Sequence, residues 1–158
     1  QGRTLPGFIG DISYAQSNRE RYEGFCQALA DAGKKVDSSL CLTTPLGIDT
    51  YREEIDTFLS SLSRMPDAFV CASDYVACIL MQLLEKRGLR VPEDVAVSGF
   101  DNNTEDLLAE HLTTVQVFNE ELGARLALQI LYRIKYPNTP HEITYLGTNV
   151  LYRDSTGD

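Results

Sequence analysis

Two apolar runs separated by a helical pattern place the strongest constraint on the fold of this chain. The runs cover residues 68–72 and 95–100, and each is long enough for a buried strand. Between them, apolar residues recur at helical spacing up to Gly88, and Pro92 just beyond prevents the helix from resuming. Continuous apolar strands joined by a helix are typical of a βαβ unit in a parallel sheet that is covered on both faces.

The segments on either side continue this alternation of strands and helices. Expected strands are 5–10, 36–42, 113–117, 142–146 and 148–153. Expected helices are one opened by a Ser17-x-x-Glu20 capping box and ending at Gly33, one opened by Thr50-x-x-Glu53, and one from Asn119 to about Lys135. The order β-α-β-α-β-α-β-β-α-β predicts an α/β fold with a doubly wound, mostly parallel sheet.

Polar residues follow each of the four expected parallel strands. They are Asp11–Tyr14, Thr43–Thr44, Ser73–Asp74 and Asp101–Asn102. The carboxyl ends of parallel strands share one edge of the sheet, and ligands bind outside that edge. We therefore expect Asp74 and Asp101 to lie near each other at the mouth of a cleft.

The composition of the chain limits which kinds of partner it can have. Of its 158 residues 43% are hydrophobic, which is enough for one domain with a core, and no run approaches the length of a membrane span. Lys and Arg number 14 against 23 Asp and Glu, a net charge of -9. Because a surface with this negative charge repels phosphate backbones, the chain by itself is a poor candidate for contacting DNA.

The cysteines form neither a metal motif nor a redox motif, because no C-x-x-C occurs. Cys26 and Cys78 fall in expected helices, and Cys41 and Cys71 in expected strands. Buried free thiols are favoured over disulfides, and they indicate a reducing compartment.

Several kinds of catalytic or cofactor site are excluded by the motifs that the sequence lacks. There is no G-x-G-x-x-G, no G-x-x-x-x-G-K-[ST] and no G-x-S-x-G, and neither His111 nor His141 has metal-ligand spacing. No cofactor, metal or enzyme activity is therefore predicted. What remains is a cleft with carboxylate, hydroxyl and amide groups beside Arg21, which is typical of a site for a sugar or a similar polar metabolite.

Each candidate site residue also has a structural alternative. Asp74 directly precedes a helix, so N-capping is favoured over ligand contact. Arg21 is equally compatible with a solvated helix position, and Asp101 with an Asx-turn after a strand. Tyr14 and Tyr51 can pack or stack. The shared edge of the sheet is what supports a binding site.

Blocks spread over nearly the whole chain match one known family, in order. They are Arg21–Phe25 with Ala28, Leu29 and Gly33; Pro66–Asp74 with Ala77; Gly88–Asn102, which reads G-L-x-V-P-E-D-V-x-V-x-G-F-D-N; Leu112–Val115; Glu121–Gly123; and Arg153–Thr156. With these blocks the chain resembles the effector-binding domain of the lactose/galactose repressor (LacI/GalR) family.

The resemblance implies a periplasmic-binding-protein-like (type I) body of two lobes with a small molecule, most often a sugar or nucleobase, bound between them. Matching positions imply that Arg21 and Asp101 grip the ligand. Ser73, Asp74 and Tyr14, expected at the same edge of the sheet, are the further ligand-binding candidates. Ser73 and Asp74 stand where the family usually has Asn-Asp. The serine lacks the amide that both donates and accepts, so the ligand or its contact pattern can differ here.

The resemblance also divides the chain into three parts. Residues 1–117 are expected to be the C-terminal lobe, 118–147 a crossover helix and strand that belong to the N-terminal lobe, and 148–158 a return segment. The chain begins at Gln1 rather than Met, and we expect a truncated piece that lacks the DNA-binding headpiece and most of the first lobe. Because the crossover helix is broadly apolar, we expect it to pack back on the sheet or to pair with another copy.

Three functional hypotheses follow. The first is the effector-sensing part of a cytoplasmic, homodimeric, sugar-responsive repressor, which contacts operator DNA only through its headpiece and contacts no membrane. The alternative is a periplasmic sugar-binding protein of a transport system, but free cysteines and the G-F-D…L-T-T-V…R-x-S-T pattern favour the repressor. A small α/β enzyme ranks last, because the sequence offers no nucleophile, base or phosphate loop.

Overall fold

The computed structural model describes residues 2–103 and 107–157 and is built around the predicted parallel sheet. The four parallel strands lie in the order β2-β1-β3-β4. Their bounds are β1 (Pro6–Ile9), β2 (Cys41–Leu42), β3 (Ala68–Cys71) and β4 (Ala96–Ser98). The register pairs Ile9 with both Leu42 and Cys71, so the carboxyl ends finish at one edge, as the sequence predicts.

A second, two-stranded sheet continues from the β4 side. Strands β5 (Thr114–Gln116) and β6 (Asn149–Leu151) are antiparallel. Parallel bridges from Ser98 to Thr113 and from Asp101 to Gln116 join this pair to the end of β4.

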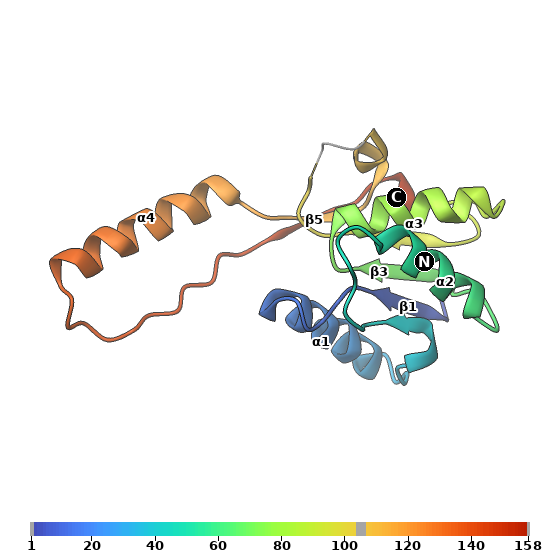
Figure 1. The fold of residues 1–158 in the computed structure, drawn as a ribbon, viewed down its shortest axis with the longest axis horizontal. Coiled ribbons are helices and arrows are strands. Elements are labelled where there is room, and N and C mark those ends of the chain that lie inside the picture. The colour runs from blue at the N-terminus through green and yellow to red at the C-terminus, as the bar shows by residue number, and fades with distance from the viewer. Residues whose placement is uncertain (1, 104–106, 158) are drawn as a thin grey trace.

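Helices cover both faces of the four-stranded sheet, which confirms the doubly wound fold (Figure 1). The α-helices are α1 (Gln16–Asp31), α2 (Tyr51–Ser61), α3 (Asp74–Lys86) and α4 (Asn119–Lys135), and the short 3-10 helices are η1 (Ser38–Leu40), η2 (Leu107–His111) and η3 (Asp154–Thr156). Helix α1 packs on one face, and α2 and α3 pack on the other. The order of strands and α-helices is the predicted one.

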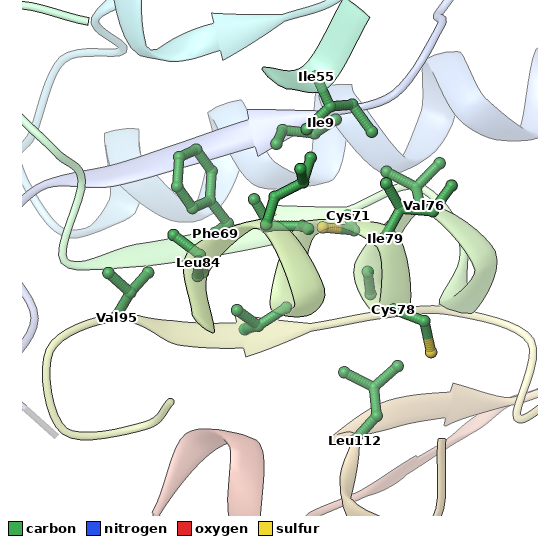
Figure 2. Close-up of a cluster of buried hydrophobic side chains, with 14 of the residues drawn as sticks. Ile9, Ile55, Phe69, Cys71, Val76, Cys78, Ile79, Leu84, Val95 and Leu112 are labelled. Atoms are coloured by element: carbon green, nitrogen blue, oxygen red, sulfur yellow. The ribbon is translucent and has the colours of Figure 1, made fainter. Parts of the chain in front are cut away.

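The main hydrophobic core lies between the sheet and the pair α2–α3 (Figure 2). Ile9 and Phe69 point into it from the strands, and Leu84 fills it from α3. Alternation along β1 sends the neighbouring Phe8 to the opposite face, where it packs against Phe25 of α1. Strands β1, β2 and β3 are apolar throughout because helices cover both faces of the sheet.

Two glycines end helices where the sequence predicts. Gly33 follows α1 with φ 70°, and Gly88 follows α3 with φ 73°. A left-handed residue directs the chain out of a helix and costs glycine little, because glycine has no Cβ.

The capping box predicted for Ser17 and Glu20 is wrong. Helix α1 has Ala15 at the N-cap position without a side-chain cap, and Ser17 lies inside the first turn. The reason is upstream: the Asp11 carboxylate accepts hydrogen bonds from the amide and hydroxyl of Ser13, at 2.7 and 2.6 Å. This closes the preceding loop earlier, so the helix begins sooner than the box implies.

The second predicted capping box is displaced by one residue. Thr50 holds the N-cap position of α2, but its hydroxyl bonds Glu54 rather than capping the helix with Glu53. Glu54 Oε1 also accepts from the Gly47 amide at 3.0 Å. Here the carboxylate closes the loop before the helix.

The predicted strand 36–42 is reduced to Cys41–Leu42, because 3-10 helix η1 replaces its first part. Asp37 caps η1, its Oδ1 accepting from the amide and hydroxyl of Ser39 at 3.0 and 2.6 Å. A short acidic side chain that accepts from the backbone amide two residues on competes here with strand formation.

Helix α4 has the predicted bounds but stands clear of the four-stranded sheet and of helices α1, α2 and α3 (Figure 1). None of its residues is buried, so the expectation that it packs back on the sheet is wrong. Asn119 is its first residue and Phe118 its N-cap, without a side-chain cap. Within 2–103 and 107–157, no helix is both long and apolar enough to cross a membrane.

The predicted strand 142–146 is also wrong, and of 148–153 only β6 is a strand. A strand needs a backbone partner. The 142–146 segment instead runs beside α4, where Gln129 Nε2 donates to a Glu142 carboxylate oxygen at 2.7 Å.

Candidate functional site

Arg21 and Asp101 form an ion pair at the carboxyl edge of the sheet. Arg21 Nη2 lies 3.4 Å from Asp101 Oδ1. Arg21 comes from the N-terminal part of α1, and Asp101 follows β4. Parallel strands that end at one edge bring these distant residues together, as the sequence predicts.

Arg21 is anchored from three directions and is not a solvated helix residue, since its side chain is 19% exposed. Its Nη1 donates to the Ala72 carbonyl at 2.5 Å and to Asn18 Oδ1 at 3.4 Å. Its guanidinium lies 3.7 Å from the centre of the Phe100 ring. These contacts orient the planar guanidinium toward Asp101.

Burial dominates the electrostatics of the pair. Burial raises the pKa of Asp101, and although Arg21 lowers it, the net direction is upward. Burial also lowers the pKa of Arg21, against the opposing effect of Asp101 and Asp74. Both charges are therefore less well solvated than in water, while the Asp101 side chain remains 43% exposed. An exposed carboxylate beside an oriented guanidinium can accept from, and donate to, vicinal hydroxyl groups.

Asp74 is buried below the carboxyl edge of the sheet, which is called the rim from here on. It is not the N-cap of α3. It is 2% exposed, and its carboxylate accepts from Thr114 Oγ1 at 2.6 Å and from the Asn103 amide at 2.7 Å. A Cβ on Gly99 would lie 2.2 Å from Asp74 Oδ1, so the close approach requires glycine there. Burial raises the pKa of Asp74, although these hydrogen bonds oppose the shift. Asp74 therefore joins α3 to the loop after β4.

Ser73 is the residue that caps α3. Its Oγ accepts from the Val76 amide at 3.3 Å. A serine satisfies this amide as well as an aspartate would, which leaves the neighbouring Asp74 for its buried bonds. Ser73 lies at the predicted edge, with its hydroxyl used locally.

Tyr14 lies at the same edge but on the β1 side. Its side chain is 74% exposed, and its amide donates to Asp11 Oδ1 at 3.1 Å. Tyr51 packs edge-on against Tyr75, with ring centres 5.7 Å apart. Burial, followed by the charges of Asp11 and Tyr14, raises the pKa of Tyr51. Tyr51 and Tyr75 thus form an aromatic group at this end, and Tyr14 remains exposed.

Asp11 organises the loop below this group. Burial favours a higher pKa for Asp11, but hydrogen bonds from Ser13, Leu46 and Tyr14 outweigh it, so the pKa is lowered. Leu46 donates its amide to Asp11 Oδ2 at 3.3 Å.

Several residues of the site were not singled out from the sequence. Phe100 lies under Arg21, Asn18 bonds it, and Arg153 bonds Asn102 beside Asp101. Two of them leave a local signal: Asn18 is three residues before Arg21 on one helix face, and Phe100 ends the apolar run. Arg153 opens the R-x-S-T block, but that block does not reveal its contact with Asn102, which depends on the register of β6.

A hollow of about 1070 Å³ opens beside the pair along the α1 side of the sheet. Arg21 and Phe100 line it, together with Thr114 and Tyr152, whereas Asp101 does not. A ligand held by both Arg21 and Asp101 would therefore sit at the open rim, and this chain covers it from one side.

None of the four cysteines forms a disulfide, and two of them, Cys71 and Cys78, are buried. Burial raises the pKa of the Cys41 thiol to about 11. Among the residues that the structure describes, no group of three His, Cys, Asp or Glu side chains is placed to hold a metal ion.

Comparison with known proteins relates the chain to transcriptional regulators. The model of the periplasmic binding protein-like domain matches residues 1–156. The HTH-type transcriptional regulator DegA of Bacillus subtilis (strain 168) is 35% identical over 117 residues, which are 73% of this chain and 34% of that protein. The chain spans less than half of the length of the curated relatives it matches.

Solved structures agree in both fold and family. A LacI-family transcriptional regulator from Sanguibacter keddieii DSM 10542 superposes with a TM-score of 0.84 at 28% identity, over 99% of this chain and 60% of that one. The transcriptional regulator CelR in complex with cellobiose gives 0.86 at 29%, over 98% and 47%. The matched residues and the fold thus agree: this chain belongs to the periplasmic-binding-protein-like domain family, in the form found in LacI/GalR-type transcriptional regulators.

Proposed function

We propose that this chain is the effector-sensing part of a LacI-type transcriptional repressor, and that Arg21 and Asp101 bind a sugar or related polar metabolite. The main observation behind this proposal is the ion pair between Arg21 and Asp101, whose charged atoms lie 3.4 Å apart at the open rim. The cellobiose in the CelR complex supports a sugar as the ligand class. The activity is binding, without catalysis, in a reducing cytoplasm.

The second half of the site would come from another lobe of the same protein. We propose that residues 1–117 are the C-terminal lobe, that 118–147 cross to the N-terminal lobe, and that 148–158 return. Helix α4 has no buried residue and carries exposed apolar side chains. This supports the proposal that another lobe of the protein packs against α4. A ligand that binds the closed arrangement of lobes more tightly than the open one shifts the affinity for operator DNA. The working unit is expected to be a homodimer with a DNA-binding headpiece.

The test uses the complete protein, with operator DNA first selected from a pool of random duplexes. Cellobiose and D-ribose are titrated while DNA binding is followed by fluorescence anisotropy. Asp101→Ala should abolish the response to sugar and leave DNA affinity within about twofold, because Asp101 acts on the ligand alone. A loss of one charge-assisted hydrogen bond is worth about tenfold or more in affinity.

Arg21 and Arg19 provide a matched pair for the same assay. Both lie on α1, but Arg19 is exposed whereas Arg21 is anchored over Phe100. Arg21→Lys should weaken the sugar response about tenfold, and Arg19→Lys should leave it unchanged. A wild-type response retained in both Asp101→Ala and Arg21→Lys would contradict the proposed site.

A further inference from the structure

The turn at Asp101 and Asn102 has a backbone conformation that is unfavourable without support from neighbouring residues. Asp101 has φ 111° and Asn102 has φ 54°, both in the left-handed region that non-glycine residues seldom adopt. Such a conformation persists when the surroundings hold it, and functional sites are where it is commonly found. What holds this turn therefore decides where the Asp101 carboxylate stands.

The backbone of the turn is bonded to β5. The Asp101 amide donates to the Val115 carbonyl at 3.0 Å, and the Asn102 amide donates to Thr114 Oγ1 at 3.3 Å. These bonds fix the two peptide groups.

The side chain of Asn102 is bonded by Arg153. Arg153 Nη2 donates to Asn102 Oδ1 at 2.8 Å, while its Nη1 donates to the carbonyls of Ala109 and Leu112 at 3.0 and 2.9 Å. One planar guanidinium thus ties Asn102 to the other end of the segment that leads to β5. A lysine offers no rigid fork that reaches all three acceptors.

Arg153 is itself held in place by Thr113, which directly precedes β5, and by the link of Ser155 to Val97 on β4. Its amide donates to Thr113 Oγ1 at 2.8 Å. Two residues on, the buried Ser155 hydroxyl donates to the Val97 carbonyl and accepts from the Thr113 amide, each at 2.7 Å. The guanidinium is therefore presented to Asn102 from a fixed base.

We infer that Arg153 is a positioning residue, which holds the Asp101–Asn102 turn through Asn102 and so sets the Asp101 carboxylate. Arg153 follows β6, the strand by which the chain returns to the sheet after α4 (Figure 1). The ligand role of Asp101 rests on the proposed function, but the hold of Arg153 on the turn does not.

The test is a double-mutant cycle read by amide hydrogen exchange of residues 98–103, in the complete protein without ligand. Arg153→Lys should accelerate exchange there about tenfold, because a hydrogen bond from a charged donor is lost. In the background of Asn102→Gly, which keeps the left-handed backbone without strain, Arg153→Lys should add less than about twofold. Asn102→Asp keeps an acceptor for Arg153 and should exchange within about twofold of the wild type.

Arg87→Lys is the matched control. Arg87 also donates to backbone carbonyls, those of Leu83 and Asp56 at 3.2 and 3.0 Å, but on α2 and α3. It should leave exchange at 98–103 unchanged. Equal acceleration by Arg153→Lys in both backgrounds, or no acceleration in either, would overturn the inference, since a merely structural arginine would not act through Asn102.

A ligand arm separates the two proposals. Calorimetric titration with cellobiose and D-ribose should show weaker binding in Arg153→Lys than in the wild type. A wild type that binds neither sugar counts against the proposed sugar ligand, and the exchange data, which use no ligand, still decide whether Arg153 holds the turn.

Discussion

At the scale of single residues, Arg21 and Asp101 are held by geometry more than by mutual attraction. Burial opposes both charges, raising the pKa of Asp101 and lowering that of Arg21. Partly buried ion pairs commonly lose in desolvation much of what they gain in attraction. The pair is therefore better explained by what it does at the rim than by a contribution to stability.

The raised pKa of Asp101 predicts how stability varies with pH. The folded chain binds this proton more tightly than the unfolded chain, whose value is near 3.8, so stability from this group falls as pH rises from 3.8 through the folded pKa. Asp101→Asn should thus match the wild type at pH 3.5 and melt higher at pH 7. Solvent screening at a 43% exposed side chain limits the gain to about 1–2 °C.

Asp94 supplies a control of opposite sign for this melting series. Its bonds to Arg90 lower the pKa of Asp94 to about 2, so its contribution is present at pH 7 and is lost as pH falls from 3.8 toward 2. Asp94→Asn should therefore lower the melting temperature at pH 7. A melting temperature for Asp101→Asn below that of the wild type at pH 7 would show that the Arg21–Asp101 pair is net stabilising.

At the scale of secondary-structure elements, α3 begins with a side-chain cap, whereas α1 and α2 begin without one. In α3 the cap is Ser73, and in the loop before α1 the carboxylate of Asp11 bonds Ser13. In both places the sequence also contains a nearby residue with a similar polar side chain. Which of the two makes the hydrogen bond depends on their distances from the amide in the folded chain.

The cap at Ser73 gives a prediction for α3. Ser73→Ala should lower the free energy of unfolding by about 1 kcal/mol, within the ~0.5–2 kcal/mol typical of a lost N-cap. Urea unfolding measures it. Ser17→Ala, at an exposed position inside the first turn of α1, should change it by less than about 0.5 kcal/mol. Equal effects of the two changes would contradict the assignment of Ser73 as the cap.

Helix α4 gives a prediction about association. Its exposed apolar side chains include Leu126, 60% exposed, and Ile130, 52% exposed. Residues 1–158 alone should associate with rising concentration in sedimentation velocity, because this surface has no cover in the chain. Leu126→Glu with Ile130→Glu should reduce the association, whereas Gln27→Glu with Thr57→Glu, on other helices, should not. A concentration-independent monomer would refute pairing through α4.

At the scale of the whole molecule, the stability of the chain is concentrated in one body. The core between the sheet and α3 includes Leu80, Leu83 and Leu84, each at most 2% exposed, whereas α4 has no buried residue. A fully buried leucine contributes about 1.5–3 kcal/mol through the area it removes from water. The sheet and its three covering helices therefore carry the fold.

A pair of leucines tests this distribution. Leu84→Ala, fully buried on α3, should cost about 2–5 kcal/mol, and the chain should unfold at much lower urea. Leu128→Ala makes the same change on α4, where the side chain is 62% exposed, and should cost less than about 0.5 kcal/mol. Comparable losses would mean that α4 is packed in solution.

The sequence by itself determined the parallel strands, the main helices and their glycine ends, but not the caps of α1 and α2. Apolar runs gave the parallel strands, the 3.6-residue stripe gave α2 and α3, and Gly33 and Gly88 gave the helix ends. The common edge for Arg21 and Asp101 also followed, because parallel strands end on the same side. Ligand binding by these two residues stays a prediction.

Only the tertiary structure decided how these pieces meet. Burial made Asp74 a bonded residue beneath the rim, the absence of a packing partner left α4 bare, and the register of β6 brought Arg153 to Asn102. Such contacts join residues tens of positions apart, so local periodicity carries no record of them. They are set by strand register and desolvation, which arise only when the chain has folded.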